Sequence, residues 1–368
     1  MTVSSFDRLN SRVSRRVVVT SALAAPLAAA LLRAPRAGAQ DAITVTMVTD
    51  TAGLGDRNFN DSAKAGLDLA VTDLGITGEV IESTETSQYV QNLINAAEQS
   101  ELTVGVGFLL TDAITEVAGQ YPDDFFLLID AVSEAPNVAG VTFREHEAAF
   151  LAGVVSGLTT TTNLLGIVGG QRIPPVIRYE VGFIAGVKSV NQAAGDTVIV
   201  AYTDSFGDPA LGKEFALAQY NEGADIVLPI AGRTGIGCYE AAVEKGPEFY
   251  VVGADVDQDY LAPGQQVCTA FKGVGDALYL ATQQVIEGSF VGGPQDLGLV
   301  EGGVDLTVPG AMVTPDTLTI MEQYKAAIIA GTLTVPATDE ELAAYTPTAP
   351  DALSAASPMA SPEASPAA

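Results

Sequence analysis

The sequence predicts an α/β protein of two doubly wound, Rossmann-like lobes joined by a multi-strand hinge. Short apolar stretches begin near Ile43 and alternate with amphipathic stretches of helical length, and the alternation starts again after residue 160. Runs such as Phe125–Ile129 are continuously apolar, which is typical of strands in a parallel sheet covered on both faces by helices. The 368 residues, 48% of them hydrophobic, are enough for two such lobes.

The first lobe is expected within residues 40–143. Its expected strands are Ile43–Thr49, Glu79–Ile81, Leu102–Gly107, Phe125–Ile129 and Val138–Phe143. Its expected helices are Asp61–Leu74, Tyr89–Gln99 and Asp112–Ala118. The helices lie between successive strands, as the connections of a parallel sheet require.

The second lobe is expected within residues 144–255, where the same alternation returns. Its expected strands are Leu165–Val168, Thr197–Tyr202, Ile226–Pro229 and Phe249–Gly253. Its expected helices are Glu145–Thr160, Arg178–Val190, Pro209–Glu222 and Gly235–Lys245. The two lobes therefore have the same architecture without a short repeat of fixed period.

The chain is expected to cross between the lobes more than once. A strand at Val267–Phe271 and a helix at Val274–Glu287 follow the second lobe, and we assign residues 256–290 to the first lobe on their account. Residues 291–345 are expected to return to the second lobe. Several crossings form a hinge with a cleft beside it, which is the usual place for a small ligand.

The two ends of the chain have the composition of segments outside the lobes. Residues 1–39 combine Ser14-Arg15-Arg16, an apolar stretch to Leu32 and Ala37-Gly38-Ala39, which are the three parts of an export signal, and the arginine pair favours the twin-arginine type. Residues 346–368 are rich in Pro, Ala and Ser, which predicts a disordered tail. We therefore expect an exported protein, in the periplasm or on the extracellular face of the plasma membrane.

Charge disfavours two classes of partner. The formal net charge is −28, and because residues 1–39 hold six Arg and one Asp, the rest of the chain carries −33. Such a surface repels the phosphates of nucleic acids and the headgroups of anionic lipids. The partner is therefore expected to be a small molecule and not a nucleic acid.

The residue inventory gives little support to catalysis. The one histidine, His146, cannot form a His-ligand metal site, and no nucleophile–base pair is recognisable. We expect no enzyme, no cofactor and no metal. Cys238 and Cys268 leave two readings open, a disulfide permitted by export or two buried thiols that behave as small hydrophobic residues.

Polar and aromatic residues at the ends of the expected strands are the candidates for ligand binding, because the carboxyl ends of parallel strands face the cleft. Asp50 follows the first strand, and Phe59 lies in the polar loop after it, where a stacking role and local packing are both possible readings. For Asn60 and Asp61 the alternative is capping of the next helix.

Further candidates follow later strands. Asp130 comes directly after Phe125–Ile129, and Phe206 lies in a loop between a strand and a helix. Gly232 belongs to a glycine-rich turn whose N–H groups are free for a polar ligand. Asp255 lies in an acidic loop whose spacing does not fit a calcium site, and Lys272 closes a late strand.

The order of these motifs resembles the basic membrane protein family (purine nucleoside receptor A-like) of substrate-binding proteins of ABC transporters. The resemblance runs from about residue 43 to residue 304. The motifs that carry it are Val48-Thr49-Asp50 with Phe59-Asn60, Gly105–Asp112, Phe125–Ala131, Val138–Arg144 with Phe150–Gly153, Ala201–Phe206, Leu217–Tyr220 and Gly253–Gln258. His146, Arg233 and Lys64 depart from the family pattern, and the common lipid anchor of the family is missing.

The resemblance implies a type I periplasmic-binding-protein fold and a role for each candidate residue. Phe59 and Phe206 would enclose a nucleobase between their rings. Asp130 together with Asn60 or Asn58 would contact the edge of the base. The ribose would be held by four residues, Asp50, Gly232, Asp255 and Lys272.

The leading functional hypothesis is an exported, monomeric receptor that captures a nucleoside, of the purine class, between two lobes and delivers it to the permease of an ABC-type importer. One alternative keeps the fold and changes the ligand to a sugar or another small metabolite. Another is a module that presents its ligand to a membrane receptor for sensing. An enzyme such as a nucleoside hydrolase is disfavoured by the residue inventory.

Overall fold

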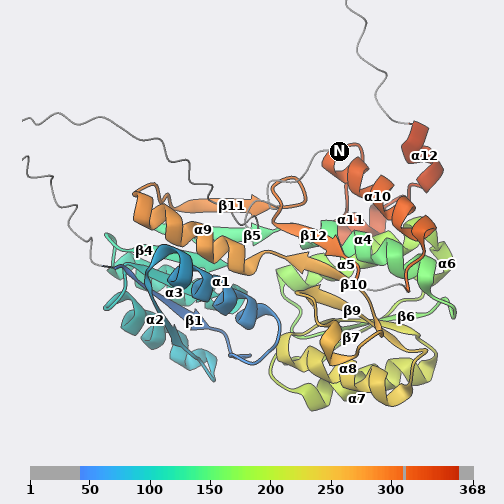
Figure 1. Cartoon of the computed structure of the whole chain (residues 1–368), viewed down its shortest axis with the longest axis horizontal. Coiled ribbons are helices and arrows are strands. Elements are labelled where there is room, and N and C mark those ends of the chain that lie inside the picture. The colour runs from blue at the N-terminus through green and yellow to red at the C-terminus, as the bar shows by residue number, and fades with distance from the viewer. Residues whose placement is uncertain (1–41, 310–311, 356–368) are drawn as a thin grey trace, which may run out of the picture. The chain divides into compact units, whose positions relative to one another are not determined.

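The computed structural model describes residues 42–309 and 312–355. It contains two six-stranded sheets, each covered by helices (Figure 1), so the predicted fold class is confirmed. The expected export signal lies outside the described residues. Within the two described ranges, no helix combines the length and the apolar character needed to cross a bilayer.

The first sheet has the order β11-β5-β4-β3-β1-β2, and all of its pairings are parallel. Its strands are β1 (Thr44–Thr49), β2 (Thr77–Ile81), β3 (Leu102–Val106), β4 (Phe125–Ile129), β5 (Val138–Phe143) and β11 (Gly293–Leu297). The order reverses beside β1, since β2 pairs on one side of it and β3 on the other. This reversal is where an open α/β sheet binds its ligand.

The second sheet has the order β12-β10-β9-β8-β6-β7, in which only β12 pairs antiparallel. Its strands are β6 (Leu165–Gly169), β7 (Ile199–Tyr202), β8 (Ile226–Ile230), β9 (Tyr250–Asp255), β10 (Gln266–Lys272) and β12 (Val304–Thr307). Its strand order reverses beside β6. The two sheets therefore share one topology around their reversal points.

Helices connect most of the strands, as a parallel sheet requires. In the first lobe they are α1 (Phe59–Leu74), α2 (Tyr89–Ala97), α3 (Thr111–Gln120) and α9 (Val274–Glu287). In the second they are α4 (Glu145–Thr159), α5 (Pro174–Val190), α6 (Gln192–Gly195), α7 (Pro209–Glu222), α8 (Ile236–Lys245), α10 (Pro315–Ile329), α11 (Asp339–Ala344) and α12 (Pro350–Ala355). Helix α9 lies beside α1 (Figure 1), although residues 75–273 separate them in the chain.

The contact between α1 and α9 depends on two glycines. A Cβ atom at Gly66 of α1 would lie 2.1 Å from the carbonyl oxygen of Gly275 in α9, so no side chain fits there. The backbones approach this closely only because both positions lack a side chain. The glycines thus anchor the start of α9 on the first lobe.

The chain crosses between lobes at places that differ from the expectation. Strand β10 pairs with β9 in the second sheet, so the assignment of all of residues 256–290 to the first lobe is wrong, and the crossing comes after Lys272. Strand β11 pairs with β5 in the first sheet, so residues 291–345 do not return to the second lobe as a unit. By its composition, an apolar strand such as Gln266–Lys272 could belong to either sheet. The strand with which it pairs determines which sheet it joins.

The expected tail is also partly ordered. Tyr324 of α10 donates a hydrogen bond to the Thr348 carbonyl (2.6 Å), and Leu353 of α12 packs against the hydrophobic core. Residues 346–355 therefore belong to the folded protein, and the disordered tail predicted for all of 346–368 is wrong for this part. Residues 356–368 lie outside the described residues.

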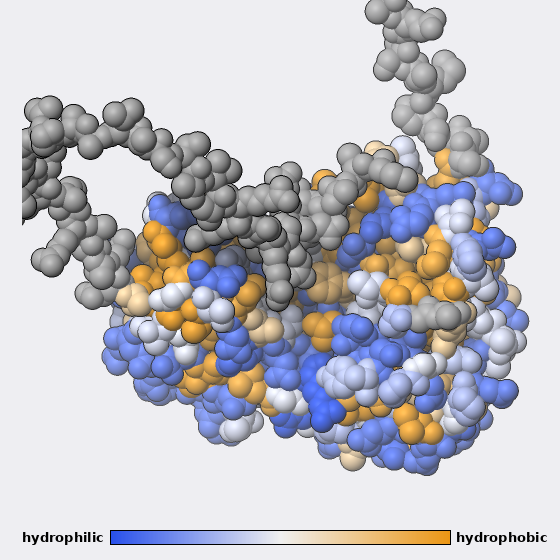
Figure 2. Space-filling view, in the orientation of Figure 1, coloured by the Kyte–Doolittle hydropathy of each residue, from blue (hydrophilic) through white to orange (hydrophobic). Residues whose placement is uncertain are grey.

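The visible surface is largely polar (Figure 2). Figure 2 shows hydrophilic residues over much of the visible face, with apolar residues scattered between them. The apolar residues with the greatest exposure include Val291 (71%), Val300 (62%) and Tyr260 (61%). Single exposed apolar side chains of this kind are normal for a protein surface.

Both cysteines are free thiols in the structure, which favours the second of the two readings. Cys238 of α8 and Cys268 of β10 are fully buried, and burial raises the pKa of each thiol. The thiolate is the reactive form, so both should be inert in the folded protein. We expect no alkylation of the native protein by iodoacetamide and two alkylated cysteines after unfolding without reductant. Mass spectrometry checks this, and a mass two hydrogens lower without alkylation would show a disulfide instead.

Candidate functional site

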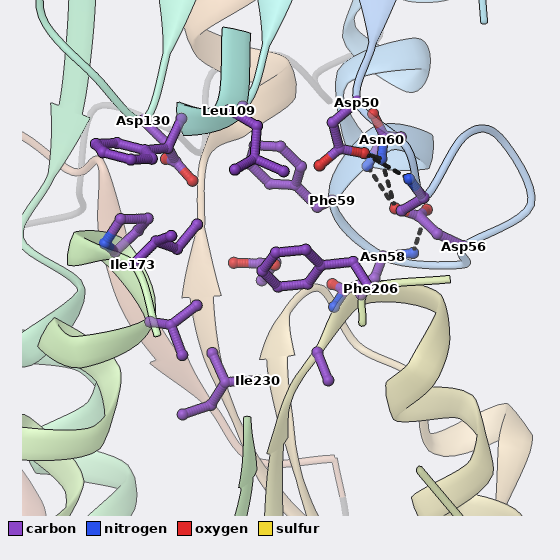
Figure 3. Close-up of a pocket in the computed structure, with 18 of the residues that line it drawn as sticks. Asp50, Asp56, Asn58, Phe59, Asn60, Leu109, Asp130, Ile173, Phe206 and Ile230 are labelled. Carbon is purple, nitrogen blue, oxygen red and sulfur yellow. Dashed lines mark hydrogen bonds between the residues drawn. The ribbon is translucent and has the colours of Figure 1, made fainter. Parts of the chain in front are cut away.

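A pocket lies where the carboxyl ends of both sheets meet (Figure 3). It encloses about 560 Å³ not filled by protein atoms, open solvent at its mouth included. All nine residues predicted to bind a ligand line it, namely Asp50, Asn58, Phe59, Asn60, Asp130, Phe206, Gly232, Asp255 and Lys272. The rule that strand ends face the ligand crevice therefore predicted residues that line the pocket.

Asp50 follows β1 and has one carboxylate oxygen fixed by the protein. Its Oδ1 accepts hydrogen bonds from the Ala52 N–H and from Nδ2 of Asn60, both at 2.9 Å. Its other oxygen is directed into the pocket (Figure 3). Burial raises the pKa of Asp50 to about 6, against the opposing effect of these two hydrogen bonds. Asp50 is thus an acceptor whose charge changes near neutral pH.

Asp56 organises the loop between β1 and α1, and the sequence reasoning missed it. Its buried carboxylate accepts from the N–H groups of Asn58 (3.0 Å), Asn60 (2.8 Å) and Asp61 (3.1 Å). Asp56 therefore satisfies N–H groups of the first turn of α1, whose N-cap residue is Asn58, and the alternative that Asn60 or Asp61 caps this helix is wrong. An acidic residue shortly before a helix is an N-cap signal that could have identified Asp56.

Asn60 has its amide orientation set by two carboxylates. Its Nδ2 donates to Asp50 Oδ1 and to Asp56 Oδ2 (3.1 Å), which uses both amide hydrogens (Figure 3). Its Oδ1 is buried and has no hydrogen-bond partner among the described residues. Asn60 can therefore only accept from a further group.

Asp130, Asp255 and Lys272 join the two lobes in the wall of the pocket. Lys272 Nζ at the end of β10 lies 2.9 Å from Asp130 Oδ2, after β4, and 3.3 Å from Asp255 Oδ1, at the end of β9. Both Asp residues have a positive φ, +68° and +61°, a conformation that Asp tolerates better than most residues. Burial alone would lower the pKa of Lys272, but the neighbouring carboxylates outweigh it and raise this pKa.

A second buried ion pair supports the first. Glu145 at the start of α4 is fully buried, and Arg178 of α5 donates to it through Nε at 2.5 Å. Lys272 Nζ lies 3.7 Å from the other oxygen of Glu145. Lys272 is therefore surrounded by three carboxylates of the protein. The role of holding ribose, implied for it by resemblance, stays a prediction.

Asp130 retains one free oxygen. Its Oδ2 is taken by Lys272, while its buried Oδ1 has no partner within the described ranges of the chain. A buried carboxylate oxygen left without a donor is costly, so a ligand that donates a hydrogen bond here would be stabilised. Burial raises the pKa of Asp130, which the charge of Lys272 opposes.

Two aromatic rings reach the pocket, one from each lobe. Phe59 is the first residue of α1 and not a loop residue as expected, and its side chain is only 8% exposed. The Lys272 ammonium lies 4.7 Å from the centre of its ring. Phe206 comes from the loop after β7 and is half-buried. Figure 3 shows the two rings one above the other, next to the Asp50 carboxylate.

The backbone makes room for these groups at Gly107. It follows β3 with φ +116°, and a Cβ there would lie 3.3 Å from Asp50 Oδ2 and 3.4 Å from Cε1 of Phe59. A side chain would thus be strained and would crowd both ligand-facing groups. Most of the remaining wall is apolar and was not predicted; it includes Leu109, Ile173, Val176, Tyr179 and Ile230.

Asn58, Gly232 and Asp255 contribute contacts between the lobes. With its Nδ2 turned toward the second lobe, Asn58 donates to the Ala254 carbonyl (2.8 Å) and to Asp255 Oδ2 (3.2 Å). Asp255 Oδ1 accepts from the Tyr179 hydroxyl at 2.8 Å. Both oxygens of Asp255 therefore already have protein partners. A Cβ on Gly232 would lie 3.7 Å from that of Ala52 in the first lobe, so the lobes meet here.

Comparison with known proteins agrees with the site. The family model described as "ABC transporter substrate-binding protein PnrA-like" (Bmp) matches residues 43–339. The chain is 34% identical to the CD4+ T-cell-stimulating antigen of Listeria monocytogenes over 318 residues, 80% of this chain and 88% of that protein. It is 33% identical to the "ABC transporter nucleoside-binding protein BmpA" of Lactococcus lactis over 316 residues, 80% of this chain and 89% of that protein.

A solved structure supports both the fold and the family. It is the structure of ABC transporter solute-binding proteins from Aeropyrum pernix K1, with a TM-score of 0.75 and 30% identity. The match covers 82% of this chain and 98% of that one. The type I binding-protein fold is thus confirmed, and the family model, the Lactococcus lactis relative and this solved structure are described as binding proteins and not as enzymes. The chain belongs to the PnrA-like family of ABC transporter substrate-binding proteins, which its resemblance to the basic membrane protein family predicted.

Proposed function

We propose that the protein binds a nucleoside, of the purine class, in the pocket between its lobes. A substrate-binding protein of an ABC importer works outside the cytoplasm and passes a small ligand to a permease. That the ligand is a nucleoside goes beyond membership of the family, and one observation supports it most directly. The buried, unpartnered Oδ1 of Asp130 lines the same pocket as Phe59 and Phe206, so donor and stacking contacts can be made to one ligand.

Two physical arguments support this ligand class. Stacking on an aromatic side chain is worth about 1–3 kcal/mol per base and tolerates different bases. The acceptors Asp50, Asn60 and Asp130 favour a ligand that presents N–H and O–H groups. The 33% identical relative from Lactococcus lactis is described as nucleoside-binding, which adds support from outside the structure.

Calorimetry of the mature protein, from Gln40 onward, tests the proposal. Inosine, guanosine and adenosine should bind more tightly than cytidine or uridine, and each should bind more tightly than its free base. Ribose and arabinose belong in the panel because the Asp residues would also accept from sugar hydroxyls. Tighter binding of a pentose than of any nucleoside would reject the nucleoside and favour the sugar alternative.

Nucleoside affinity should depend on pH through Asp50. Ligand hydroxyl or N–H groups donate better to the ionised carboxylate, so binding should lower the pKa of Asp50 from about 6 and release a proton. Affinity should rise from pH 5 to pH 7.5, by about tenfold if the bound pKa falls to about 4.

Calorimetry in buffers of different ionisation enthalpy measures the proton released. Asp50→Asn should abolish most of the pH dependence. His146 should contribute little, because burial lowers its pKa to about 4. Affinity that is constant across this range in the parent protein would show that Asp50 does not accept a ligand hydrogen.

We also propose that residues 1–39 are an export signal of the twin-arginine type, supported by Arg15-Arg16, the apolar stretch and Ala37-Gly38-Ala39. Changing Arg15 and Arg16 together to Lys should leave full-length precursor in the cytoplasm. Immunoblotting of cell fractions checks this. Normal secretion of the double variant would indicate the general export route and would leave the ligand proposal untouched.

A further inference from the structure

Away from the ion-pair network and the chain crossings, two hydrogen bonds between the lobes fall on one short segment of the first lobe, Leu54–Asn58, which we call the closure segment. Arg233 donates through Nη2 to the Leu54 carbonyl. Gln258 donates through Nε2 to the Arg57 carbonyl at 2.9 Å. These two donors come from separate parts of the second lobe, the turn after β8 and the turn after β9. Both act on backbone and not on side chains.

The closure segment is held rigidly by its own lobe. Its N–H groups donate to three carboxylates of the first lobe, those of Glu82, Asp61 and Asp56. The four bonds run from Leu54 to Glu82 (2.8 Å), from Gly55 and Arg57 to Asp61 (2.8 and 2.9 Å), and from Asn58 to Asp56 (3.0 Å). The carbonyls of Leu54 and Arg57 are therefore presented to the second lobe in fixed positions. Carboxylates on the N–H side also polarise the peptide groups, which strengthens the carbonyls as acceptors.

The two donors differ in how the second lobe holds them. Gln258 is buried, and its Oε1 accepts from the Tyr239 hydroxyl at 3.3 Å. Arg233 is half-buried, and none of the ion pairs found among the described residues includes it. A half-buried guanidinium that uses a carbonyl instead of a carboxylate gains most from that contact when the lobes are closed.

We propose that Arg233 and Gln258 hold the closed form of the protein and so determine how long any ligand stays bound. Neither residue lines the pocket, so neither distinguishes one ligand from another. Apparent affinity is the intrinsic affinity scaled by the closed fraction, so weakening these contacts lowers affinity equally for every ligand. The proposal rests on the two-lobed fold and not on the identity of the ligand.

Arg233→Ala, Gln258→Ala and the double variant test this. In stopped-flow experiments, each single variant should release inosine and adenosine about tenfold faster than the parent, by the same factor for both ligands. Small-angle scattering of the ligand-free proteins should show a larger radius of gyration in the double variant than in the parent. Arg233→Lys should release the ligands less rapidly than Arg233→Ala, since an ammonium still donates to the Leu54 carbonyl. Circular dichroism confirms folding of each variant.

Arg57→Ala is the matched control. Arg57 is exposed and lies in the closure segment, and the contact that Gln258 makes with it goes to its carbonyl and not to its side chain. Its removal takes away the same charge and should change neither dissociation nor scattering. If Arg233→Ala accelerates the dissociation of inosine and of adenosine by different factors, the proposal is overturned, because Arg233 would then contact the ligand.

Unchanged dissociation and unchanged scattering in the double variant would overturn it as well. If neither nucleoside binds the parent, the nucleoside proposal fails and scattering of the ligand-free proteins decides alone. A larger radius in the double variant then supports the contact, and an unchanged radius rejects it.

Discussion

Replacing Asp130 by Asn should raise the Kd for a nucleoside about 10- to 150-fold, which corresponds to about 1.5–3 kcal/mol. Lys272 lies on the Oδ2 side of Asp130 and will bind the amide oxygen of the new side chain. The amide NH₂ then faces the pocket in place of the free Oδ1, so a donor meets the donors of the ligand. Calorimetry with inosine and guanosine measures the loss.

The matched control for this change is Asp204→Asn. Asp204 also has a positive φ, +54°, but it is exposed and does not line the pocket. The same substitution in the same backbone conformation should leave affinity unchanged. If Asp130→Asn binds as tightly as the parent, Asp130 serves only as the partner of Lys272 and does not contact the ligand.

Replacing Phe206 by Ala should weaken nucleoside binding by about 1–3 kcal/mol and leave the affinity for ribose, where measurable, unchanged. Phe206 is half-buried, so the melting temperature of the unliganded protein should fall little. Phe59→Ala is less informative, because Phe59 belongs to the hydrophobic core and its loss should reduce stability as well.

Phe125→Ala provides the control for Phe206. Phe125 is 37% exposed and pairs with Phe290 at a ring distance of 5.0 Å, away from the pocket. It should keep full nucleoside affinity. Equal losses of ribose and nucleoside binding in Phe206→Ala would instead mean that the ring shapes the pocket without stacking on a base.

The sequence was sufficient to find the pocket because the chemistry lies at strand ends. Asp50 and Asp130 directly follow strands, and Asp255 and Lys272 end strands, so the parallel-sheet rule alone places them at one edge. Asp56 was missed because its pattern is that of a solvated loop acid. Its role depends on the backbone folding around it, which composition does not reveal.

The strand partners late in the chain could not be predicted. Strands β11 and β12 are short and partly polar, with sequences GPQDL and VDLT, so they lack the apolar run that marked the others. Strand β10 has that run, but its place beside β9 is a matter of pairing between distant segments. Tyr179 was missed for a related reason, because the face that α5 turns to the pocket depends on how the helix packs.

The position of Lys272 has a consequence for charged ligands. Within the part of the chain that the structure describes, it is the one cationic side chain in the pocket wall, and Asp130, Asp255 and Glu145 surround it. A phosphate could use this cation only by competing with three carboxylates that are already in place, while repelled by Asp50. A nucleotide would therefore have to lose its phosphate outside the cell before a nucleoside receptor of this design could bind the remaining nucleoside.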